Sequence, residues 1–233
     1  MIKYKKVTAG EFICRPNRFI AKVNIDGKEE TVHVKNTGRC RELLVPGCRV
    51  ILSVADNPER KTQYDLVAVY KEQIGKQPLF INMDSQIPND VAEEWLRKSN
   101  LFSTSAVLRR EVKFGNSRFD FCVEDGERKA FVEVKGVTLE DHGIAMFPDA
   151  PTERGIKHIN ELEFAISEGF EAYILFVIQM KGIFKFCPND ITHKAFGDAL
   201  RTAVDNGVKI LAVDCVVQED SIEADKNVEV SLY

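Results

Sequence analysis

Residues 106–138 constrain the fold of this chain more than any other stretch, because they predict three consecutive strands joined by tight turns. The first turn fits Gly115-Asn116, with glycine at its first central position, and the second turns around Asp125-Gly126. Apolar residues alternate with others between the turns, over about 106–114, 117–124 and 129–138. The sequence therefore predicts an antiparallel sheet in the middle of the chain.

Charged residues are set into two of these predicted strands. If 114 pairs with 117, Glu111 lies opposite Asp120. If 120 pairs with 131, Glu133 is a diagonal neighbour of Asp120, roughly 7 Å away. This register puts Glu111, Asp120, Glu133 and Lys135 on one side, and Phe119, Phe121, Val132 and Val134 on the other, where we expect the core.

Such a patch has a specific chemical use. Neighbouring carboxylates repel and need protonation, a cation or water between them. Mg²⁺ (or Mn²⁺) binds one or two carboxylates and keeps several waters, and a substrate phosphate would complete its shell. Lys135 would position the attacking water or stabilise charge on the phosphate. The patch indicates either a site for phosphodiester hydrolysis or a solvated sheet face.

The remaining second half predicts helices that cover this sheet. A helix begins after the Thr152 cap, carries an apolar stripe and ends at Gly169. Further helices are predicted over 88–99 and 189–206, and further strands over 173–179 and 208–217. The order α-β-β-β-α-β-α-β predicts a mixed sheet with helices on its faces, an α/β (α+β) fold.

The first third predicts a small β-barrel. Asp26-Gly27 is a strong hairpin signal between two alternating strands, and strands follow near 48–55 and 62–70. One or two helical turns are predicted in "TGRCRELLVPG". Five short strands favour an OB-like barrel, with an SH3-like barrel as the alternative. Because 75–90 has no clear period, it predicts a linker and two domains, 1–82 and 83–233.

Charge is distributed unevenly between these parts. The net charge is −4, but residues 1–80 hold 15 Lys and Arg against 9 Asp and Glu, whereas residues 81–233 hold 17 against 27. A basic barrel suits the phosphates of DNA, with Phe19 and Tyr64 as stacking platforms. An ordinary solvated surface is the alternative. The predicted DNA contacts are Arg15, Arg18, Arg39, Arg41, Arg60 and Lys61 on the barrel, and Arg154 and Lys157 at a helix start.

Several other classes of protein have little support. The six cysteines form no C-x-x-C pair, so we expect reduced thiols in a cytoplasmic protein. No apolar run approaches the roughly 20 residues that span a bilayer, and no secretory signal is visible. We therefore expect no membrane association. No glycosidase carboxylate pair or glycine-rich nucleotide loop stands out, and the oligomeric state, monomer or dimer, stays open.

The motifs together resemble a known family. An Asp followed by Glu-Val-Lys on a hairpin after a helix looks like the PD-(D/E)xK nuclease core, with Phe119 in place of the proline. More specifically, the chain resembles the sugar fermentation stimulation protein A family of bacteria and archaea. The matching stretches are "RPNRFIA", "HVKNTGRCRELLVPG", "RKTQYDLV", "SRFDF", "VEVKGVTL", "FPDAPTERGIKHINEL", "LFVIQM" and "GVKILAVDC".

This resemblance implies an OB-like domain joined to a PD-(D/E)xK-like domain, and DNA binding. It implies metal ligation by Asp120 and Glu133 and catalysis by Lys135, with Glu111 as a further candidate. Two functions remain open: a Mg²⁺-dependent nuclease, or a non-catalytic, sequence-nonspecific DNA-binding regulator of sugar (maltose-type) metabolism. His158 as a metal ligand and Gln179 as a site contact are weaker hypotheses, because hard cations prefer oxygen and a glutamine can simply complete a strand end.

Overall fold

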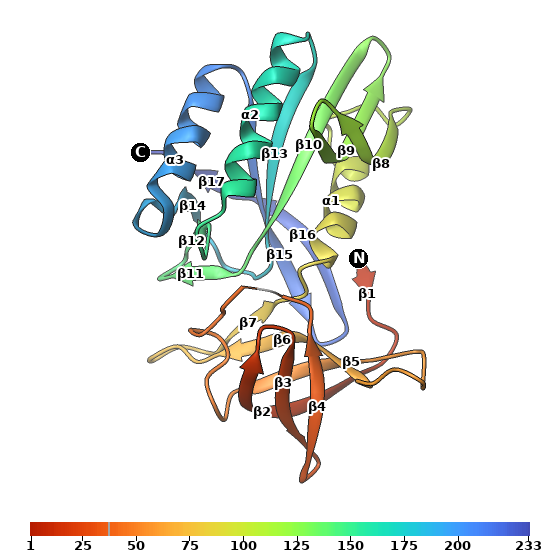
Figure 1. Cartoon of the computed structure of the whole chain (residues 1–233), viewed down its shortest axis with the longest axis vertical. Helices are drawn as coiled ribbons and strands as arrows, with labels where there is room; N and C mark the ends of the chain where they lie inside the picture. The colour runs from red at the N-terminus through yellow and green to blue at the C-terminus, as the bar shows by residue number, and fades with distance from the viewer. Residues whose placement is uncertain (37) are drawn as a thin grey trace.

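A closed five-stranded barrel forms one end of the computed structural model, which describes residues 1–36 and 38–233 (Figure 1). Its strands pair in the order β4-β3-β2-β5-β6, and a parallel pairing of β4 with β6 closes it. This closure between the third and fifth strands is the OB arrangement, so the OB-like prediction is confirmed. The strands are β2 (Val7–Asn17), β3 (Ile20–Ile25), β4 (Lys28–Val34), β5 (Arg49–Val54) and β6 (Tyr64–Lys71).

Local sequence explains how the barrel turns. Asp26 (φ 50°) and Gly27 (φ 85°) both adopt the left-handed conformation that a two-residue hairpin needs, and the flanking residues 25 and 28 pair. Within residues 38–47 the Leu44 N–H donates to the Cys40 carbonyl at 2.9 Å in one turn, and a second turn at Pro46-Gly47 is closed by the Cys48 N–H, which donates to the Val45 carbonyl at 3.0 Å. Thr37, which begins the predicted helical segment, lies outside the described residues.

The segment predicted as a linker is largely ordered into elements. β7 (Leu79–Asn82) pairs with β6 and extends the barrel sheet, and α1 (Ile87–Lys98) begins five residues later. At the other end of the predicted first domain, β1 (Ile2–Lys3) pairs with β16 of the larger sheet, outside the barrel. The two parts are therefore connected by both ends of the barrel chain.

The larger part is a seven-stranded sheet covered on both faces (Figure 1). Its strand order is β1-β16-β15-β13-β10-β9-β8, and the central β10, β13 and β15 run parallel. α1 packs on one face, while α2 (Glu153–Ser167) and α3 (Asp190–Asp205) pack on the other. The further strands are β8 (Val107–Phe114), β9 (Ser117–Asp125), β10 (Arg128–Val137), β13 (Glu171–Ile178), β15 (Lys209–Gln218) and β16 (Ser221–Asn227).

The predicted helix boundaries are close to those observed. The Thr152 hydroxyl accepts from the Gly155 N–H at 3.0 Å and caps α2, and Gly169 (φ 87°) follows its end. By contrast, the sequence did not predict β16 or a small four-stranded sheet. That sheet comprises β11 (Leu139–Asp141), β12 (Ile144–Phe147), β14 (Lys185–Pro188) and β17 (Glu229–Val230), whose strands are too short to show a period.

The prediction of one common core face for the hairpin phenylalanines is wrong. Phe119 packs with Phe114 and Phe131 on the α2 side, whereas Phe121 packs on the α1 side. Side-chain alternation therefore breaks at Asp120, opposite which Glu111 adopts the left-handed region (φ 55°). Since helices cover both faces, either direction buries a phenylalanine.

No helix among residues 1–36 and 38–233 combines the length and apolar character that crossing a membrane requires.

Candidate active site and basic cavity

The register of the second hairpin differs from the prediction by two residues. Asp125 pairs with Arg128, so the turn is Gly126-Glu127 rather than Asp125-Gly126. Gly126 (φ 63°) takes the first central position, and the Asp125 carboxylate stays in the strand, where it accepts from the Ser103 N–H at 2.9 Å. The first hairpin pairs 114 with 117 as predicted.

This shift moves Glu133 from the diagonal to a position beside Asp120. The observed ladder pairs Val132 with Phe121, the residues adjacent to Glu133 and Asp120 in their strands. A shift of two residues keeps Glu133 and Lys135 on their predicted side of β10, because strands repeat with period two, whereas alternation on β9 breaks at Asp120. The two carboxylates therefore remain neighbours in a register that the sequence misjudged.

Asp120 is held by two hydrogen bonds from different elements. The Asn89 amide, in the first turn of α1, donates to Oδ1 at 2.9 Å, and the Val134 N–H donates to Oδ2 at 2.7 Å. Burial and the nearby Glu133 charge raise the pKa of Asp120, and these hydrogen bonds only partly oppose that rise. The positive charge and hydrogen bonds around Asp120 are therefore too few to offset its burial and the charge of Glu133.

Glu133 is buried and asymmetrically bonded. Its Oε1 accepts from Lys135 Nζ at 2.5 Å and contacts Nδ1 of His158, on α2. Burial by itself raises the pKa of Glu133, but the His158 hydrogen bond and the Lys135 charge outweigh it and hold the pKa below its usual value. Its Oε2 is buried and has no hydrogen-bond partner among the described residues.

Lys135 lies two residues beyond Glu133 on β10, so both side chains point to the same side of the strand. Its side chain is 16% exposed, against 4% for Glu133. Glu133 is therefore the more deeply buried of these two side chains, and solvent reaches Lys135 more readily.

The sequence did not predict that Asn89 bonds to Asp120 or that His158 contacts Glu133. Asn89 is 31 residues from Asp120, and no local sequence pattern predicts a contact between them. His158 was weighed as a metal ligand, yet it contacts a carboxylate, and its Nε2 accepts from Arg154 Nε at 3.4 Å. The spacing of Arg154 and His158 by four residues on one helix was the available signal.

Two other predicted residues make no hydrogen bond or ion pair with this cluster among the described residues. The Glu111 side chain is 59% exposed and is 3.7 Å from Arg118, its only ion-pair partner in the described part of the chain. Lys157 Nζ donates to the Asn116 carbonyl at 3.0 Å, at the tip of the first hairpin. Their predicted roles, in catalysis and in DNA contact, therefore gain no support from the contacts they make.

The carboxylate pair fits a hard cation. No group of three or more His, Cys, Asp or Glu side chains within residues 1–36 and 38–233 is arranged to hold a metal ion. Mg²⁺, however, commonly uses only one or two carboxylates and keeps its waters. A cation between the two carboxylates would give Oε2 of Glu133 a partner and would oppose the rise in the pKa of Asp120.

Four of the six predicted barrel cations line one cavity of 430 Å³, namely Arg15, Arg18, Arg39 and Arg41. Asn17, Gly38 and Leu44 complete its lining, which contains no acidic residue among those described. Arg18 also stacks on the exposed Phe19 ring, with 4.8 Å between the guanidinium and the ring centre.

Arg15 hydrogen-bonds to the backbone that surrounds this cavity. Its guanidinium donates to the carbonyls of Gly38 and Arg39, each at 2.8 Å, and to those of Arg18 and Asn36 at 2.7 and 2.6 Å. These bonds occupy its terminal nitrogens and tie the loop before Cys40 to the end of β2. Arg15 therefore shapes the cavity, whereas Arg18, Arg39 and Arg41 make no side-chain hydrogen bond or ion pair with any described residue.

Arg60 and Lys61 lie elsewhere on the barrel. Arg60 donates both terminal nitrogens to the Asp65 carboxylate, at 3.0 and 2.8 Å, and His33 also contacts that carboxylate. Lys61 is exposed beside it. Arg60 is thus already paired, and the structure does not bring these two residues to the arginine cavity.

A smaller cavity of 180 Å³ lies between the barrel and the sheet. Asn36, Gly38 and Ser85 line it from one side, and Gly136 and Asp149 from the other. Gln179 also lines it, and its buried amide donates to Asn82 Oδ1 and to the Asp84 carbonyl, both at 3.0 Å. Gln179 therefore links the two parts of the molecule beside Gly136, the residue after Lys135.

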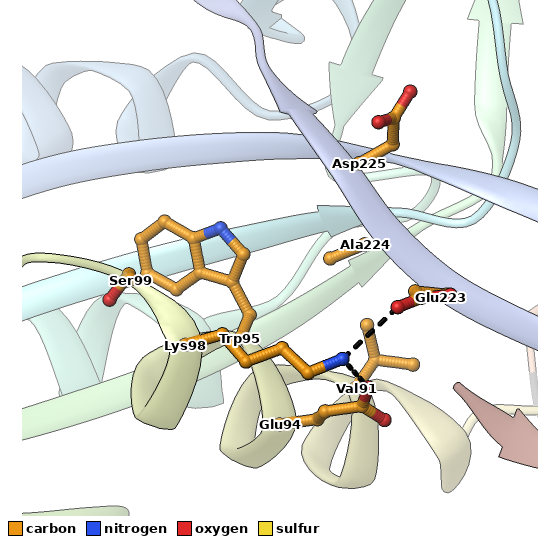
Figure 2. A pocket seen from close by; sticks show the side chains of 8 residues that line it. All are labelled: Val91, Glu94, Trp95, Lys98, Ser99, Glu223, Ala224 and Asp225. Atoms are coloured by element: carbon orange, nitrogen blue, oxygen red, sulfur yellow. Dashed lines mark hydrogen bonds and ion pairs between the residues drawn. The ribbon is translucent and has the colours of Figure 1, made fainter. Parts of the chain in front are cut away.

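A different kind of pocket lies behind α1 (Figure 2). Its 210 Å³ are bordered by the Trp95 indole and by three carboxylates, with Lys98 bridging Glu94 and Glu223. Figure 2 shows the Lys98 ammonium between these two acids. Its acidic border is opposite in charge to the arginine cavity.

Residues 86–221 match the family profile described as the sugar fermentation stimulation protein RE domain, and residues 13–76 match the SfsA N-terminal OB domain. The chain belongs to the sugar fermentation stimulation protein family. The resemblance indicated by the sequence motifs is therefore confirmed, and the fold agrees with it.

Relatives in this family match along the whole chain. The sugar fermentation stimulation protein homolog of Desulfitobacterium hafniense (strain DSM 10664 / DCB-2) is 59% identical over 231 residues, 99% of each chain. That of Ruminiclostridium cellulolyticum is 56% identical, over 99% of this chain and all of its own. The solved structure of Pyrococcus furiosus SfsA in complex with Ca²⁺ is 26% identical, covers 99% of this chain and 98% of its own, and superposes with a TM-score of 0.84.

Proposed function

We propose that this protein of the sugar fermentation stimulation family binds DNA and hydrolyses its phosphodiester bonds with a divalent cation, Mg²⁺ or Mn²⁺. The observation that carries the proposal is the buried, unpartnered Oε2 of Glu133 beside the Asp120 carboxylate. A buried charged oxygen without a partner is costly, and a cation would satisfy it. The Pyrococcus furiosus relative solved with Ca²⁺ supports a divalent cation site in the family.

Each residue of the cluster has a distinct part in this reaction. A bound cation lowers the pKa of its water and neutralises charge on the phosphate. Asp120 and Glu133 hold the cation, and Asn89 and His158 fix the orientation of these two carboxylates. Lys135 supplies a positive charge to the phosphate oxygens and a donor for the attacking water.

The basic cavity supplies binding. Arg18, Arg39 and Arg41 line it without any ion-pair partner in the described residues, so their donors are free for phosphate oxygens. Because phosphate contacts carry no sequence information, this contribution is largely indifferent to DNA sequence. Function in a reducing cytoplasm agrees with six cysteines that are all free.

Metal-dependent cleavage of labelled DNA, compared between the parent protein and single variants, tests the proposal. Asp120→Asn, Glu133→Gln and Lys135→Met should each lower the cleavage rate by roughly 10²-fold or more, since each removes one preorganised charge. Glu124→Gln is the matched control on β9, because Glu124 pairs only with surface cations. Chelation by EDTA should stop cleavage. Activity that persists in all three variants would assign it to another site.

The second candidate, a DNA-binding regulator of sugar (maltose-type) metabolism without turnover, is favoured by a different observation. Lys135 donates to Oε1 of Glu133 and His158 contacts the same oxygen, and the described residues hold no group of three metal-ligating side chains. A thermal shift with Mg²⁺ or Mn²⁺ separates the two. A cation-dependent rise in the parent that is lost in Glu133→Gln supports the nuclease, and the absence of any shift together with salt-sensitive DNA binding supports the regulator.

A further inference from the structure

The cavity of 180 Å³ between the barrel and the larger sheet has a lining unlike that of either site described above. Its polar side chains are Asn36, Ser85, Thr138, Asp149 and Gln179, and its apolar side chains are Leu139, Met146 and Phe147. Among the described residues no Lys or Arg borders it, and neither does Asp120 or Glu133. A phosphate here would meet a carboxylate and no cation, so this cavity does not suit a nucleic-acid backbone.

Gln179 presents an acceptor to this cavity. The residue is 1% exposed, and its amide nitrogen donates to Asn82 Oδ1 and to the Asp84 carbonyl, both at 3.0 Å. Because both partners are acceptors, they fix which end of the amide is nitrogen. Oε1 lies at the other end, beside Gly136, where a Cβ would be only 2.6 Å from it. This oxygen accepts no hydrogen bond from the described residues, so it is available to a donor in the cavity.

Asp149 presents a second acceptor. Burial raises the pKa of its carboxyl, and the N–H groups of Asp149 and Ala150 only partly oppose that rise. Its Oδ2 lies against Gly38, where a Cβ would collide with it. No cationic side chain within residues 1–36 and 38–233 forms an ion pair with this carboxylate. It therefore has fewer donors around it than its burial calls for.

The smaller polar side chains add both donors and acceptors. The Ser85 hydroxyl donates to the Lys35 carbonyl at 2.8 Å and keeps its own lone pairs, while Asn36 Oδ1 accepts from the Gly38 N–H at 2.8 Å and leaves the amide nitrogen as a donor. Thr138 is 8% exposed and adds a hydroxyl. An ammonium group only donates and a carboxylate only accepts, whereas a hydroxyl does both. A ligand with several hydroxyls therefore matches this lining best.

The size of the cavity narrows the choice further. Its 180 Å³ correspond to about six waters at roughly 30 Å³ each, below the roughly 300 Å³ at which pockets for drug-sized ligands begin. A metal ion would leave most of this space empty, and the described residues hold no group of three metal-ligating side chains. Leu139, Met146 and Phe147 give apolar surface for the C–H faces of a small ring.

We propose that this cavity binds one small uncharged polyhydroxy compound, a monosaccharide or a cyclic polyol, through Gln179, Asp149 and Thr138. Asn36 and Ser85 border the cavity from the barrel side and the other three from the larger part, so the ligand contacts both parts. A ligand that binds only the folded protein stabilises it by mass action. This site is separate from the proposed nuclease site and requires no cleavage.

Calorimetric titration and thermal unfolding of the full chain in EDTA test the proposal. The probes are D-glucose, D-galactose, D-ribose and myo-inositol, with cyclohexanol as a ring that has a single hydroxyl. We expect at least one polyol to bind with a Kd of about 1 mM or tighter. At about 10 mM it should raise the unfolding temperature by about 3 °C, a concentration at which general exclusion of sugars from protein surfaces contributes little. A cavity that holds only water would give no heat and no shift with any of the four, and this result, or equal binding of cyclohexanol, would overturn the proposal.

Variants locate the ligand. Thr138→Val removes a hydroxyl at nearly constant volume, and Asp149→Asn removes the charge, so each should weaken polyol binding about tenfold. Asp141→Asn is the matched control, because Asp141 is exposed and its ion-pair partner in the described part of the chain is His142. Unchanged affinity in both variants, or an equal loss in the control, would exclude this cavity.

A cation arm without EDTA separates the polyol from a metal ion. Ca²⁺ or K⁺ alone should give no shift in unfolding temperature that depends on Asp149. A shift with either cation that Asp149→Asn abolishes, in a protein that binds none of the four polyols, would make this a cation site and reject the proposal.

Discussion

The arginine cavity of the barrel and the surface of the larger α/β part use their cations in opposite ways. Arg128, Lys181 and Arg201 in the larger part each contact two carboxylates. Arg18, Arg39 and Arg41 in the cavity contact none within residues 1–36 and 38–233. A cation that already has a carboxylate contributes to stability, whereas an unpaired guanidinium keeps its donors for a ligand.

The comparison teaches where to look for binding in a chain with a net negative charge. The total of −4 conceals a surplus of positive charge in the first third, and most of the cations elsewhere are neutralised locally. Substitutions that break pairs should lower stability, and substitutions of Arg18, Arg39 or Arg41 in the cavity should alter binding alone. The largest expected loss of stability is at the contact between the two parts.

Lys71→Met should lower the free energy of unfolding by about 3 kcal/mol, because it leaves a buried carboxylate without its cation. The Glu140 side chain is only 2% exposed and would keep only the Gly143 N–H as a donor. Chemical denaturation followed by fluorescence measures the change. Lys22→Met, which removes an exposed pair with Glu29, is the control and should have a much smaller effect. Equal effects would show that the interdomain pair is no stronger than a surface pair.

Arg15→Lys should lower the free energy of unfolding by about 1–2 kcal/mol, because an ammonium cannot reach the four carbonyls that the planar guanidinium bridges. DNA affinity should fall as well, since the loop that carries Arg39 loses its anchor. Thermal unfolding and anisotropy measure the two effects. Weaker binding without any loss of stability would instead make Arg15 a direct ligand of the phosphate.

The pairing of Glu171 with Arg128, one of the paired cations of the larger part, should make the stability of the protein depend on pH. Hydrogen bonds from Arg128, and further contacts with Tyr173 and Lys209, lower the pKa of Glu171 from its ordinary 4.5 to about 2. A carboxylate with a lowered pKa contributes stability above the ordinary value, and that contribution disappears as the pH falls from 4.5 toward 2. Glu171→Gln should cost about 0.5–1 kcal/mol at pH 7 for a partly exposed group.

In Glu171→Gln the free energy of unfolding should fall less steeply as the pH is lowered from 4.5 toward 2, because the glutamine amide does not bind a proton in this range. Denaturation midpoints measured between neutral and acidic pH check this. If the difference between the parent and Glu171→Gln stays constant down to the acid limit, the paired state of Glu171 does not contribute to folding.

Arg39→Ala and Arg41→Ala should change the free energy of unfolding by less than about 0.5 kcal/mol, the smallest effect of the series. Both side chains are exposed and have no carboxylate partner in the described residues, so folding loses little. The measurement is the same denaturation series used for Lys71→Met. A loss of stability comparable with that of Arg15→Lys would contradict the assignment of these arginines to binding.

Much of the fold was predictable because its signals are local. Strand alternation, the left-handed Asp26-Gly27 and Gly115 turns, and the Thr152 cap each depend on residues a few positions apart. The second hairpin was misregistered because its turn depends on Asp125 bonding to Ser103, 22 residues away. Glu133 and Lys135 kept their predicted side, since the period of a strand is two and the shift was two, whereas the break in alternation at Asp120 was not predicted.

The sequence by itself determined the OB-like barrel, the covered mixed sheet, and the placing of Asp120, Glu133 and Lys135 together, because each follows from periodicity and tight turns. Only the tertiary structure decided which side chains complete that site and which cations share a cavity. Asn89 reaches Asp120 from α1, His158 reaches Glu133 from α2, and the cavity joins residues of β2 to the loop before β5. Such contacts join segments tens of residues apart, and packing of whole elements, rather than any local preference, brings them together.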